Sequence, residues 1–387
     1  MLHRILKQNA VAMMYPIPRV SIKNSEDDVW EANSPCNQGA NMKCTGKFVA
    51  HAAVVLVLVT MFFAAGCDNS TKKEEKQEEK TYTIGFFMYN ADTYISSVAS
   101  AFESAIAGKA RVEVHSAQND QLNQNEQIDA MLARKLNVLV VNLVDIQAGG
   151  QIADKAKKAG VSVIFFNREP DLKSLANYGK ICFVGTTHLE AGKMQGDIIK
   201  NIWDNHPEYD KNKDGKLQYI MIQANPYNSE ALARSEHSVK QARKLGVSLE
   251  QIGDTLFCDW DEKQAFEAMQ LALMTLKDRV ELVIANNDSM ALGAIAALAE
   301  IGFNTGESGS GYIPVIGVDA TVQALEAIRK GVMSGTVKQD GKLMGETIAT
   351  FALNAAAGND FREGTALEWD ESGMAIRLPY FMLEGDR

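Results

Sequence analysis

From residue 82 onward, short uninterrupted apolar runs alternate with longer segments whose apolar residues recur at helical spacing. Strands without alternating polar positions are covered on both faces, which is typical of parallel sheets flanked by helices. The pattern predicts strands at 81–88, 112–115, 138–143, 161–166, 217–223, 281–285 and 313–318. It predicts helices at 95–106, 127–135, 152–159, 188–203, 230–245, 262–276 and 289–300.

The chain has 387 residues, which is longer than a single compact core usually accommodates. The sequence therefore predicts an α/β protein with two units, each a parallel sheet covered by helices. Ligands of open parallel sheets bind beyond the carboxyl ends of the strands. The residues that directly follow each predicted strand are accordingly the first candidates for a functional site.

Polar side chains follow five of the predicted strands. They are Asp92 and Tyr94; Asn167, Arg168 and Glu169; Asn228 and Glu230; Asn286, Asn287 and Asp288; and Asp319. A helix N-cap or a turn explains any one of them taken alone. Together they suit hydroxyl groups, because carboxylates accept hydrogen bonds and amides both donate and accept. No nucleophile stands beside a base and an orienting group, so the sequence predicts binding rather than catalysis.

The amino-terminal region has the features of an export signal. An apolar run at 48–65 follows Lys43 and Lys47, and small residues precede Cys67. This arrangement resembles a bacterial lipobox, in which Cys67 would be acylated; an uncleaved transmembrane helix is the alternative. We expect a disordered leader and lipoprotein signal over 1–66, a translation start at Met42, and a charged tether over 67–80.

Net charge bears on the binding partner, and the positions of the cysteines bear on anchoring and disulfide formation. The net charge of -10 argues against nucleic acid as a partner, because phosphate binding needs a basic surface. Of the five cysteines, Cys36 and Cys44 precede the expected mature chain and Cys67 is the expected anchor. We expect Cys182 and Cys258 to be buried free thiols, with a disulfide between them as the alternative.

Several segments resemble the periplasmic galactose/glucose-binding proteins of ABC transporters, over roughly 82–380. They are SAQNDQLNQNEQID (116–129), VNLVD (141–145), VIFFNREP (163–170), FVGT (183–186), NKDGKLQ (212–218), VIANNDSMALGA (283–294), VIGVDA (315–320) and SGTVKQD (334–340). The resemblance implies a type I periplasmic-binding-protein fold, with two doubly wound lobes joined by a three-segment hinge. The implied lobes are 81–186 with 340–375, and 187–339 with 376–387.

The same resemblance implies a non-enzymatic, monomeric periplasmic protein that delivers glucose or galactose to an ABC transporter permease. A role as a sugar sensor for a chemoreceptor, or binding of a different monosaccharide, is the alternative. The implied sugar contacts are Asp92, Tyr94, Asn167, Asn228, Glu230, Arg234, Trp260, Asn287, Asp319 and Gln339.

Tyr94 and Trp260 would sandwich the sugar ring, because the apolar face of a pyranose packs on an aromatic face. Asn228, Glu230 and Gln339 stand where the family has His, Asp and Asn, and Tyr94 where it has Phe. Such changes alter which hydroxyls are satisfied. The preference between glucose and galactose is therefore open, with glucose slightly favoured as the commoner carbon source.

Residues 210–218 have the spacing of the first nine positions of an EF-hand calcium loop. The expected ligands are Asp210, Asn212, Asp214, the carbonyl of Lys216, and Gln218. Met221 stands where the final Glu would be, and the resemblance assigns that role to Glu281. We expect a structural Ca²⁺ here; a polar turn without an ion is the alternative.

Two other classes of protein are alternatives to a sugar-binding transport protein. A sugar-responsive repressor would need a basic helix-turn-helix at the amino terminus, where this chain has an apolar segment. A sugar-processing enzyme would need two carboxylates at a working separation. Asp92, Glu230 and Asp319 are the carboxylates that could form such an acid/base pair. No sequence feature sets that separation.

Overall fold

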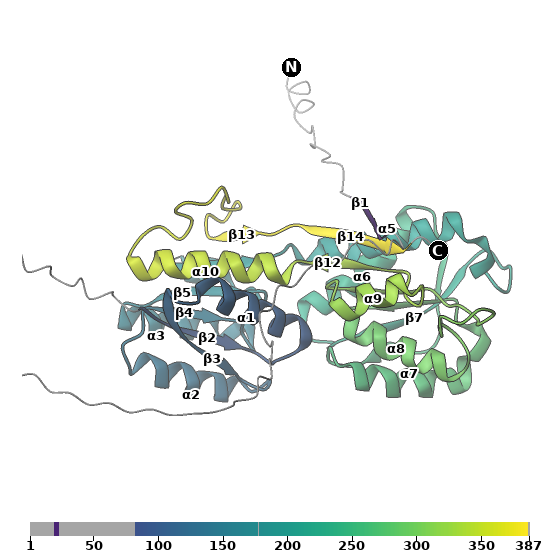
Figure 1. The fold of residues 1–387 in the computed structure, drawn as a ribbon, viewed down its shortest axis with the longest axis horizontal. Helices are drawn as coiled ribbons and strands as arrows, with labels where there is room; N and C mark the ends of the chain where they lie inside the picture. The colour runs from purple at the N-terminus through teal and green to yellow at the C-terminus, as the bar shows by residue number, and fades with distance from the viewer. Residues whose placement is uncertain (1–18, 23–81, 177, 386–387) are drawn as a thin grey trace, which may run out of the picture. The chain divides into compact units, whose positions relative to one another are not determined.

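The computed structural model describes residues 19–22, 82–176 and 178–385, and all statements below concern these residues. They form two α/β lobes, as the sequence predicts (Figure 1). The predicted export signal at 48–65, the tether at 67–80, Cys36, Cys44 and Cys67 lie outside the described residues. Residues 19–22 fall within the predicted disordered leader, yet they form the short strand β1 (Arg19–Ile22), paired in parallel with β14.

The first lobe contains a six-stranded parallel sheet in the order β13-β6-β5-β4-β2-β3. Its strands are β2 (Tyr82–Met88), β3 (Ala110–Ser116), β4 (Val138–Val141), β5 (Ser162–Phe166), β6 (Ile181–Gly185) and β13 (Ala375–Arg377). The helices α1 (Thr93–Ile106) and α10 (Gly341–Ala357) pack on one face of the sheet. The helices α2 (Gln121–Leu132) and α3 (Gly149–Ala159) pack on the other, and the short α4 (Leu172–Leu175) lies beside α3.

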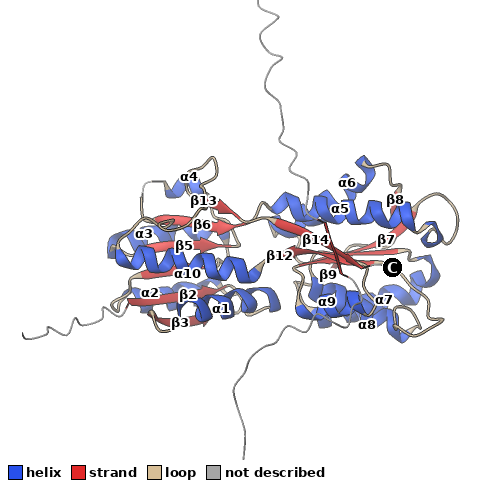
Figure 2. Cartoon of the chain, turned by 45° about the horizontal axis from the view of Figure 1, so that its top comes forward, coloured by secondary structure: helices blue, strands red, loops and turns tan. Residues whose placement is uncertain are grey.

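The second lobe is built around the sheet β1-β14-β12-β11-β10-β7-β8, with β9 also paired to β7. Its further strands are β7 (Leu217–Gln223), β8 (Leu249–Gln251), β9 (Leu256–Phe257), β10 (Leu282–Ala285), β11 (Val315–Val318), β12 (Gly335–Gln339) and β14 (Tyr380–Gly385). The helices α5 (His188–Asn205) and α6 (Ser229–Lys244) cover one face. The helices α7 (Glu262–Leu276), α8 (Asp288–Glu300) and α9 (Val322–Arg329) cover the other (Figure 2).

Four buried apolar clusters account for this layering, one on each face of each sheet. The central strands are buried along their whole length, as their unbroken apolar sequences predict. Cys182 and Cys258 are both buried free thiols, in the cores of different lobes, so the alternative of a disulfide between them is wrong.

The chain passes between the lobes three times. The crossings are the links between β6 and α5, between β12 and α10, and between β13 and β14. Strand β13 ends at Arg377 and pairs with β6, so the first sheet extends two residues past the boundary that the resemblance implies at 375. Three short links restrain how the lobes move, and a hinge of this kind permits opening and closing.

In the first sheet β2 lies between β3 and β4, and in the second sheet β7 lies between β8 and β10. The strand order therefore reverses at β2 and at β7. Ligands of doubly wound sheets bind at this reversal, beyond the carboxyl ends of the strands. The loops that follow β2 and β7 are therefore the places where the topology predicts a site.

Candidate functional site

A cavity of about 30 Å³, called the inner cavity here, lies between the strand ends of the two lobes. Nine of the ten predicted sugar contacts line it, all except Asn228. Its lining residues are Tyr89, Asp92, Tyr94, Ile95, Asn167, Arg168, Glu230, Arg234, Trp260, Asn287, Asp319 and Gln339. Residues at or after the ends of seven strands thus converge at one point, where periodicity and topology predict a site.

Asn228 was predicted as a sugar contact but does not line the inner cavity. It is the N-cap of α6, and its side-chain oxygen accepts a hydrogen bond of 2.9 Å from the amide of Ala231. An N-cap side chain turns back onto its own helix. Asn228 consequently lines a neighbouring pocket instead of the inner cavity. Asp92 and Asn287 also cap helices, α1 and α8, but both still line the inner cavity.

Sequence reasoning missed Tyr89, Ile95 and Arg168 as lining residues. Tyr89 directly follows β2, so the strand-end rule that selected Asp92 would have selected it as well. Arg168 was noted at its strand end but not placed in the site. Its guanidinium lies 3.4 Å from the centre of the Tyr89 ring, a cation–π contact that joins the ends of β2 and β5.

Arg234 is the centre of a buried network in the second lobe. It is 2% exposed, and it donates to Glu230 Oε1 at 2.7 Å, Gln339 Oε1 at 2.8 Å and the carbonyl of Asn286 at 2.8 Å. Asp319 Oδ1 lies 3.8 Å away. Burial alone would lower the pKa of Arg234, but Glu230, Tyr380 and Asp319 raise it overall, so the group stays charged.

Buried carboxylates surround this guanidinium. Burial raises the pKa of Asp319 well above its ordinary value, against the opposing effect of Arg234. Behind it, Asp288 accepts from the Thr336 hydroxyl at 2.6 Å and from the Thr321 amide at 2.7 Å. Burial raises the pKa of Asp288 to about 7. In the first lobe, burial also raises the pKa of Asp92, whose side chain accepts from the Tyr89 hydroxyl.

The two aromatic residues predicted as sugar-stacking groups both line the inner cavity. Tyr94 belongs to the first lobe, is 8% exposed, and donates weakly to Met344 Sδ at 3.6 Å. Trp260 follows β9 in the second lobe, is partly buried, and packs against the apolar cores of both lobes. The arrangement offers an apolar ring surface from each lobe beside the polar groups of the network.

Unusual backbone conformations are concentrated at this site. Asn167, Asp259, Trp260 and Asp319 have φ angles of 59°, 41°, 67° and 120°. Residues other than Gly rarely adopt such conformations, which cost of order 1–3 kcal/mol each and persist where the surroundings hold them in place. Their position at the ends of strands suggests that these side chains are held in fixed directions for binding.

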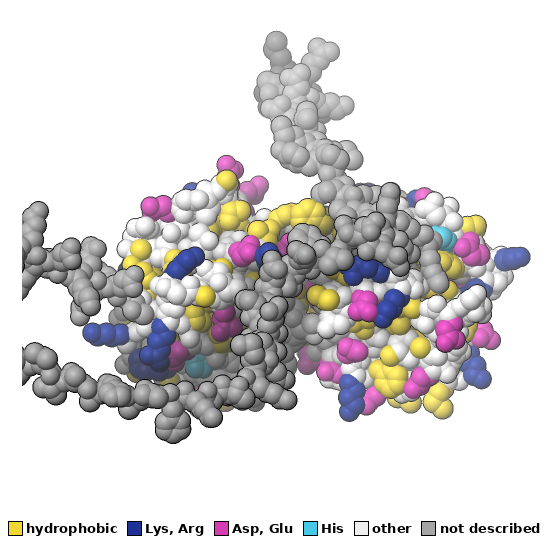
Figure 3. All heavy atoms as spheres, in the orientation of Figure 1, with side chains coloured by type: hydrophobic (Ala, Val, Ile, Leu, Met, Phe, Trp, Pro, Cys, Tyr) yellow, Lys and Arg dark blue, Asp and Glu magenta, His cyan; other side chains and the backbone are white. Residues whose placement is uncertain are grey.

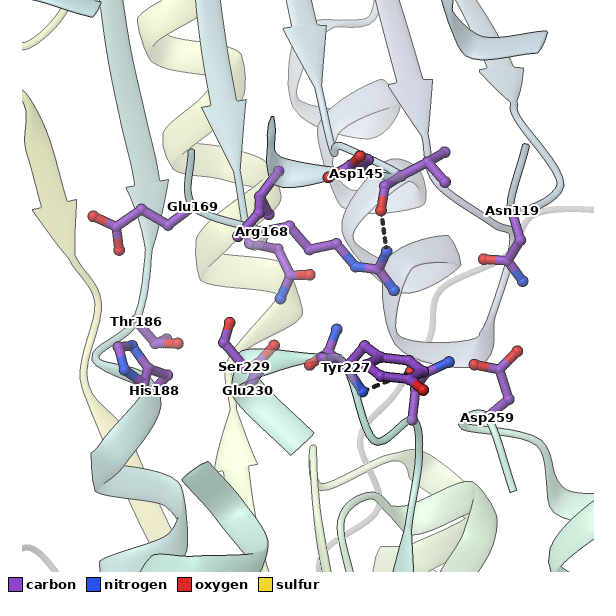
Figure 4. Close-up of a pocket in the computed structure, with 15 residues that line it drawn as sticks. Asn119, Asp145, Arg168, Glu169, Thr186, His188, Tyr227, Ser229, Glu230 and Asp259 are labelled. Atoms are coloured by element: carbon purple, nitrogen blue, oxygen red, sulfur yellow. Dashed lines mark hydrogen bonds between the residues drawn. The ribbon is translucent and has the colours of Figure 1, made fainter. Parts of the chain in front are cut away.

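A second pocket, called the outer pocket here, adjoins the inner cavity and has a volume of about 360 Å³. The two share Asn167, Arg168 and Glu230. Figure 4 shows Asn119, Asp145, Arg168 and Glu169 of the first lobe on one side of it. On the other side lie Thr186, in the link between the lobes, and five residues of the second lobe, His188, Tyr227, Ser229, Glu230 and Asp259. Arg168 donates to the carbonyl of Val144 at 3.0 Å.

The predicted calcium loop lies elsewhere in the second lobe. Asp210 Oδ1 and Oδ2 accept from the amides of Asp214 and Gly215 at 3.1 and 2.9 Å. Glu281, which is 1% exposed, accepts from the amides of Lys211 and Gln218 at 2.7 and 3.1 Å. The side chains of Asn212, Asp214 and Gln218 bond to one another, with Asn212 to Gln218 at 3.1 Å and Gln218 to Asp214 at 2.9 Å. All the predicted ligand side chains therefore belong to one connected cluster.

The oxygens of this cluster are of the kind that Ca²⁺ prefers. Among the described residues, no three His, Cys, Asp or Glu side chains are grouped so that they could hold a metal ion, and this includes Asp210, Asp214 and Glu281. The predicted set relies on amide and main-chain oxygens as well as carboxylates. Calcium binding stays a prediction at this point.

The family model of the periplasmic binding protein domain matches residues 84–360. This chain belongs to that family. The D-galactose/methyl-galactoside binding periplasmic protein MglB of Haemophilus influenzae is 34% identical over 336 residues, covering 85% of this chain and 96% of that protein. The ribose import binding protein RbsB of Bacillus subtilis is 25% identical, covering 78% of this chain and 92% of that protein.

Solved structures show the same fold. A solute-binding protein of an ABC transporter from Bacillus halodurans, with bound myo-inositol, matches with a TM-score of 0.64 and 24% identity. The match covers 80% of this chain and 96% of that one. A counterpart from Actinobacillus succinogenes, with bound D-allose, matches with a TM-score of 0.64 and 19% identity over 79% of this chain and 98% of that one.

These findings confirm the family and the fold class. The family consists of solute-binding proteins, so the chain is a periplasmic binding protein and not an enzyme. Within the described residues, no helix is both long and apolar enough to cross a membrane. On the face that Figure 3 shows, acidic and basic side chains are interspersed over the described surface.

Proposed function

We propose that the chain binds a hexose, glucose or galactose, in the inner cavity and delivers it to an ABC transporter permease. The observation that carries the proposal is that polar side chains of both lobes, among them Asp92, Arg234 and Asp319, line one cavity together with the two aromatic residues Tyr94 and Trp260. Carboxylates, amides and a guanidinium satisfy sugar hydroxyls, and charge-assisted bonds are the strong ones. The D-galactose/methyl-galactoside binding relative from Haemophilus influenzae supports galactose as one candidate.

Lobe closure is the mechanism that the arrangement supports. The inner cavity, at about 30 Å³, is far smaller than the roughly 300–1,000 Å³ that is usual for small-molecule sites. We infer that the lobes separate or rotate to admit a hexose. Once bound, it contacts residues of both lobes and stabilises the closed form in proportion to its higher affinity for that form.

Titration calorimetry with glucose and galactose tests the proposal. We expect saturable binding of at least one sugar, and Asp319→Asn should weaken it at least about tenfold, because an amide nitrogen replaces one of the two carboxyl oxygens. Asp278→Asn is the matched control, because Asp278 is an exposed residue that does not line the inner cavity. Absence of binding to either sugar by the unmodified chain contradicts the proposal.

Delivery to a transporter is tested separately from binding. Sugar-loaded protein should stimulate ATP hydrolysis by its permease complex reconstituted in proteoliposomes, and sugar-free protein should stimulate it less. A binding-competent chain that never changes the ATPase rate would contradict delivery but leave sugar binding intact. A sensor role through a chemoreceptor stays a prediction.

Attachment to the membrane through an acylated Cys67 is also proposed, on the strength of the small residues before this cysteine. Mass spectrometry of the mature protein should find an amino-terminal acylated cysteine. Cys67→Ser should move the protein from the membrane fraction to the soluble fraction. An unmodified Cys67 in a chain that still begins upstream of it would contradict the anchor.

We propose a structural Ca²⁺ in the 210–218 loop. Asp210, Asn212, Asp214, the Lys216 carbonyl, Gln218 and Glu281 would hold it. The ion would tie the loop to the start of β10, because Glu281 directly precedes that strand. Chelation with EDTA should lower the melting temperature and added Ca²⁺ should restore it, whereas Glu281→Gln should remove this response. A melting temperature that neither treatment changes argues against the site.

A further inference from the structure

The outer pocket is large enough to hold part of a ligand, although none of the roles above uses it. Its volume of about 360 Å³ falls within the range of roughly 300–1,000 Å³ that is usual for small-molecule sites. It adjoins the inner cavity through Asn167, Arg168 and Glu230, which line both. Any group on the sugar that points past these three side chains therefore enters the outer pocket.

Asn228 helps to keep this space open. Because its side chain is used to cap α6, it lies on its own helix at the wall of the outer pocket. On the opposite wall, Arg168 is held by the Tyr89 ring and by the carbonyls of Leu143 and Val144. Each of the two side chains thus has partners within its own lobe and leaves the space between them unfilled.

The lining of the outer pocket is polar and contains groups of both signs. Asp145 and Asp259 offer carboxylate acceptors, Asn119 offers an amide, and Arg168, which also lines the inner cavity, offers donors (Figure 4). Glu169 is already paired with Arg377 at 2.5 and 2.6 Å. The remaining carboxylates oppose an anionic group such as a phosphate, whereas hydroxyls can both donate to them and accept from Arg168.

We propose that the outer pocket is a second subsite for a hydroxylated substituent on the hexose. The ligand class then includes disaccharides and glycosides with a polar aglycone, in addition to the free hexose. This inference rests on the proposed function, because it assumes that one ring occupies the inner cavity.

Comparative titration of the full chain with glucose, galactose, maltose, lactose and melibiose tests the subsite. We expect at least one disaccharide to bind with an affinity equal to or above that of its better-binding monosaccharide. If no sugar binds at all, the proposed function fails. If a monosaccharide binds and every disaccharide is excluded, the proposed function stands and the subsite is wrong.

His188 provides a matched pair of variants, because it is exposed, begins α5 and lines only the outer pocket. His188→Trp should fill the pocket and weaken disaccharide binding at least about tenfold, with the monosaccharide dissociation constant changed less than about twofold. His188→Ala should preserve both. Equal effects of His188→Trp on both classes of sugar would overturn the inference.

Ile146 lines the same pocket from the first lobe. Ile146→Trp should therefore fill the pocket as well, and it provides a second test if the His188→Trp variant folds poorly. It should reproduce the selective loss of disaccharide binding. Retention of disaccharide affinity in a folded Ile146→Trp variant would show that the substituent lies elsewhere.

Discussion

The two walls of the inner cavity hold their arginines in different ways. In the second lobe, Arg234 is almost fully buried and is bonded to Glu230 and Gln339. In the first lobe, Arg168 is partly exposed, lies on the Tyr89 ring and donates to main-chain carbonyls. Arg234 is bonded directly to the Glu230 carboxylate, whereas Arg168 bonds to neutral acceptors and attracts the carboxylates of Asp92 and Asp259 without a direct bond.

This difference indicates separate tasks for the two walls. A buried hydrogen-bonded network is costly to disturb, because losing one member leaves its buried neighbours without a partner. A partly exposed cation–π contact contributes less and tolerates rearrangement. We infer that the second lobe presents a preformed polar surface and that the first lobe adapts to the sugar as the lobes close.

Arg234→Met should produce the largest effect. It leaves Glu230 and the buried Asp319 without a cation, and breaking a buried ion pair costs about 3–5 kcal/mol of unfolding free energy. Hexose affinity should fall at least about 100-fold. Denaturant unfolding and titration calorimetry provide the two readouts.

Arg168→Met is the matched control on the other wall. Loss of its cation–π contact should cost no more than about 1 kcal/mol of unfolding free energy. Equal destabilisation by the two variants would mean that the walls do not differ in the way proposed here.

Trp260→Ala should rank second, because it removes the aromatic surface that the second lobe offers to the ring. We expect hexose affinity to fall roughly 30-fold, equivalent to about 2 kcal/mol. Trp260→Phe retains an aromatic face and should recover most of the affinity. If the Phe variant is as weak as the Ala variant in calorimetry, stacking is not the role of Trp260.

Stability should also depend on pH through the second lobe. The pKa of Asp288 is raised to about 7 by burial, so the folded chain retains a proton that the unfolded chain has lost above pH 4. The free energy of unfolding should therefore be highest at low pH within this window, fall between about pH 4 and 7, and level off above it. The slope contributed by one group cannot exceed about 1.4 kcal/mol per pH unit.

Asp288→Asn should reduce this slope in denaturant unfolding measured at pH 5, 6, 7 and 8, and the part that remains would come from Asp319 and Asp92, whose pKa values burial also raises. The variant also loses the acceptor of the Thr321 amide, so its stability should be lower at pH 5 by about 1 kcal/mol. Asp92→Asn, on the first wall, should leave most of the slope in place. A slope unchanged by Asp288→Asn would assign the pH dependence to another group.

The sequence predicted much of the fold because buried strands have a distinctive composition. Strand β7 and helix α7 have the predicted bounds, 217–223 and 262–276. Helix α2 begins at Gln121 rather than at 127, because its first turn is polar and its start depends on the N-cap Asp120. Strands β6 and β12 and helices α9 and α10 were not predicted by periodicity, although β6 and β12 overlap segments of the family resemblance.

The site was predictable to the extent that strand ends determine it. Nine predicted residues converge because parallel strands end on one side of each sheet. The direction of a single side chain was not predictable in the same way. Asn228 caps its helix and lines only the outer pocket, whereas Asp92 and Asn287 cap theirs and line the inner cavity, so the N-cap role alone does not determine the direction. The contact of Arg168 with Tyr89 likewise depends on how the ends of β2 and β5 pack.

Tyr94→Phe should have the smallest effect and thereby separates stacking from hydrogen bonding on the first wall. The Tyr94 hydroxyl has a weak partner, the Met344 sulfur at 3.6 Å, so its loss should change hexose affinity less than about twofold. Tyr94→Ala removes the ring and should weaken binding much more. If Tyr94→Phe loses affinity as strongly as Tyr94→Ala in calorimetry, the hydroxyl itself contacts the sugar. The first wall would then contribute polar recognition as fixed as that of the second.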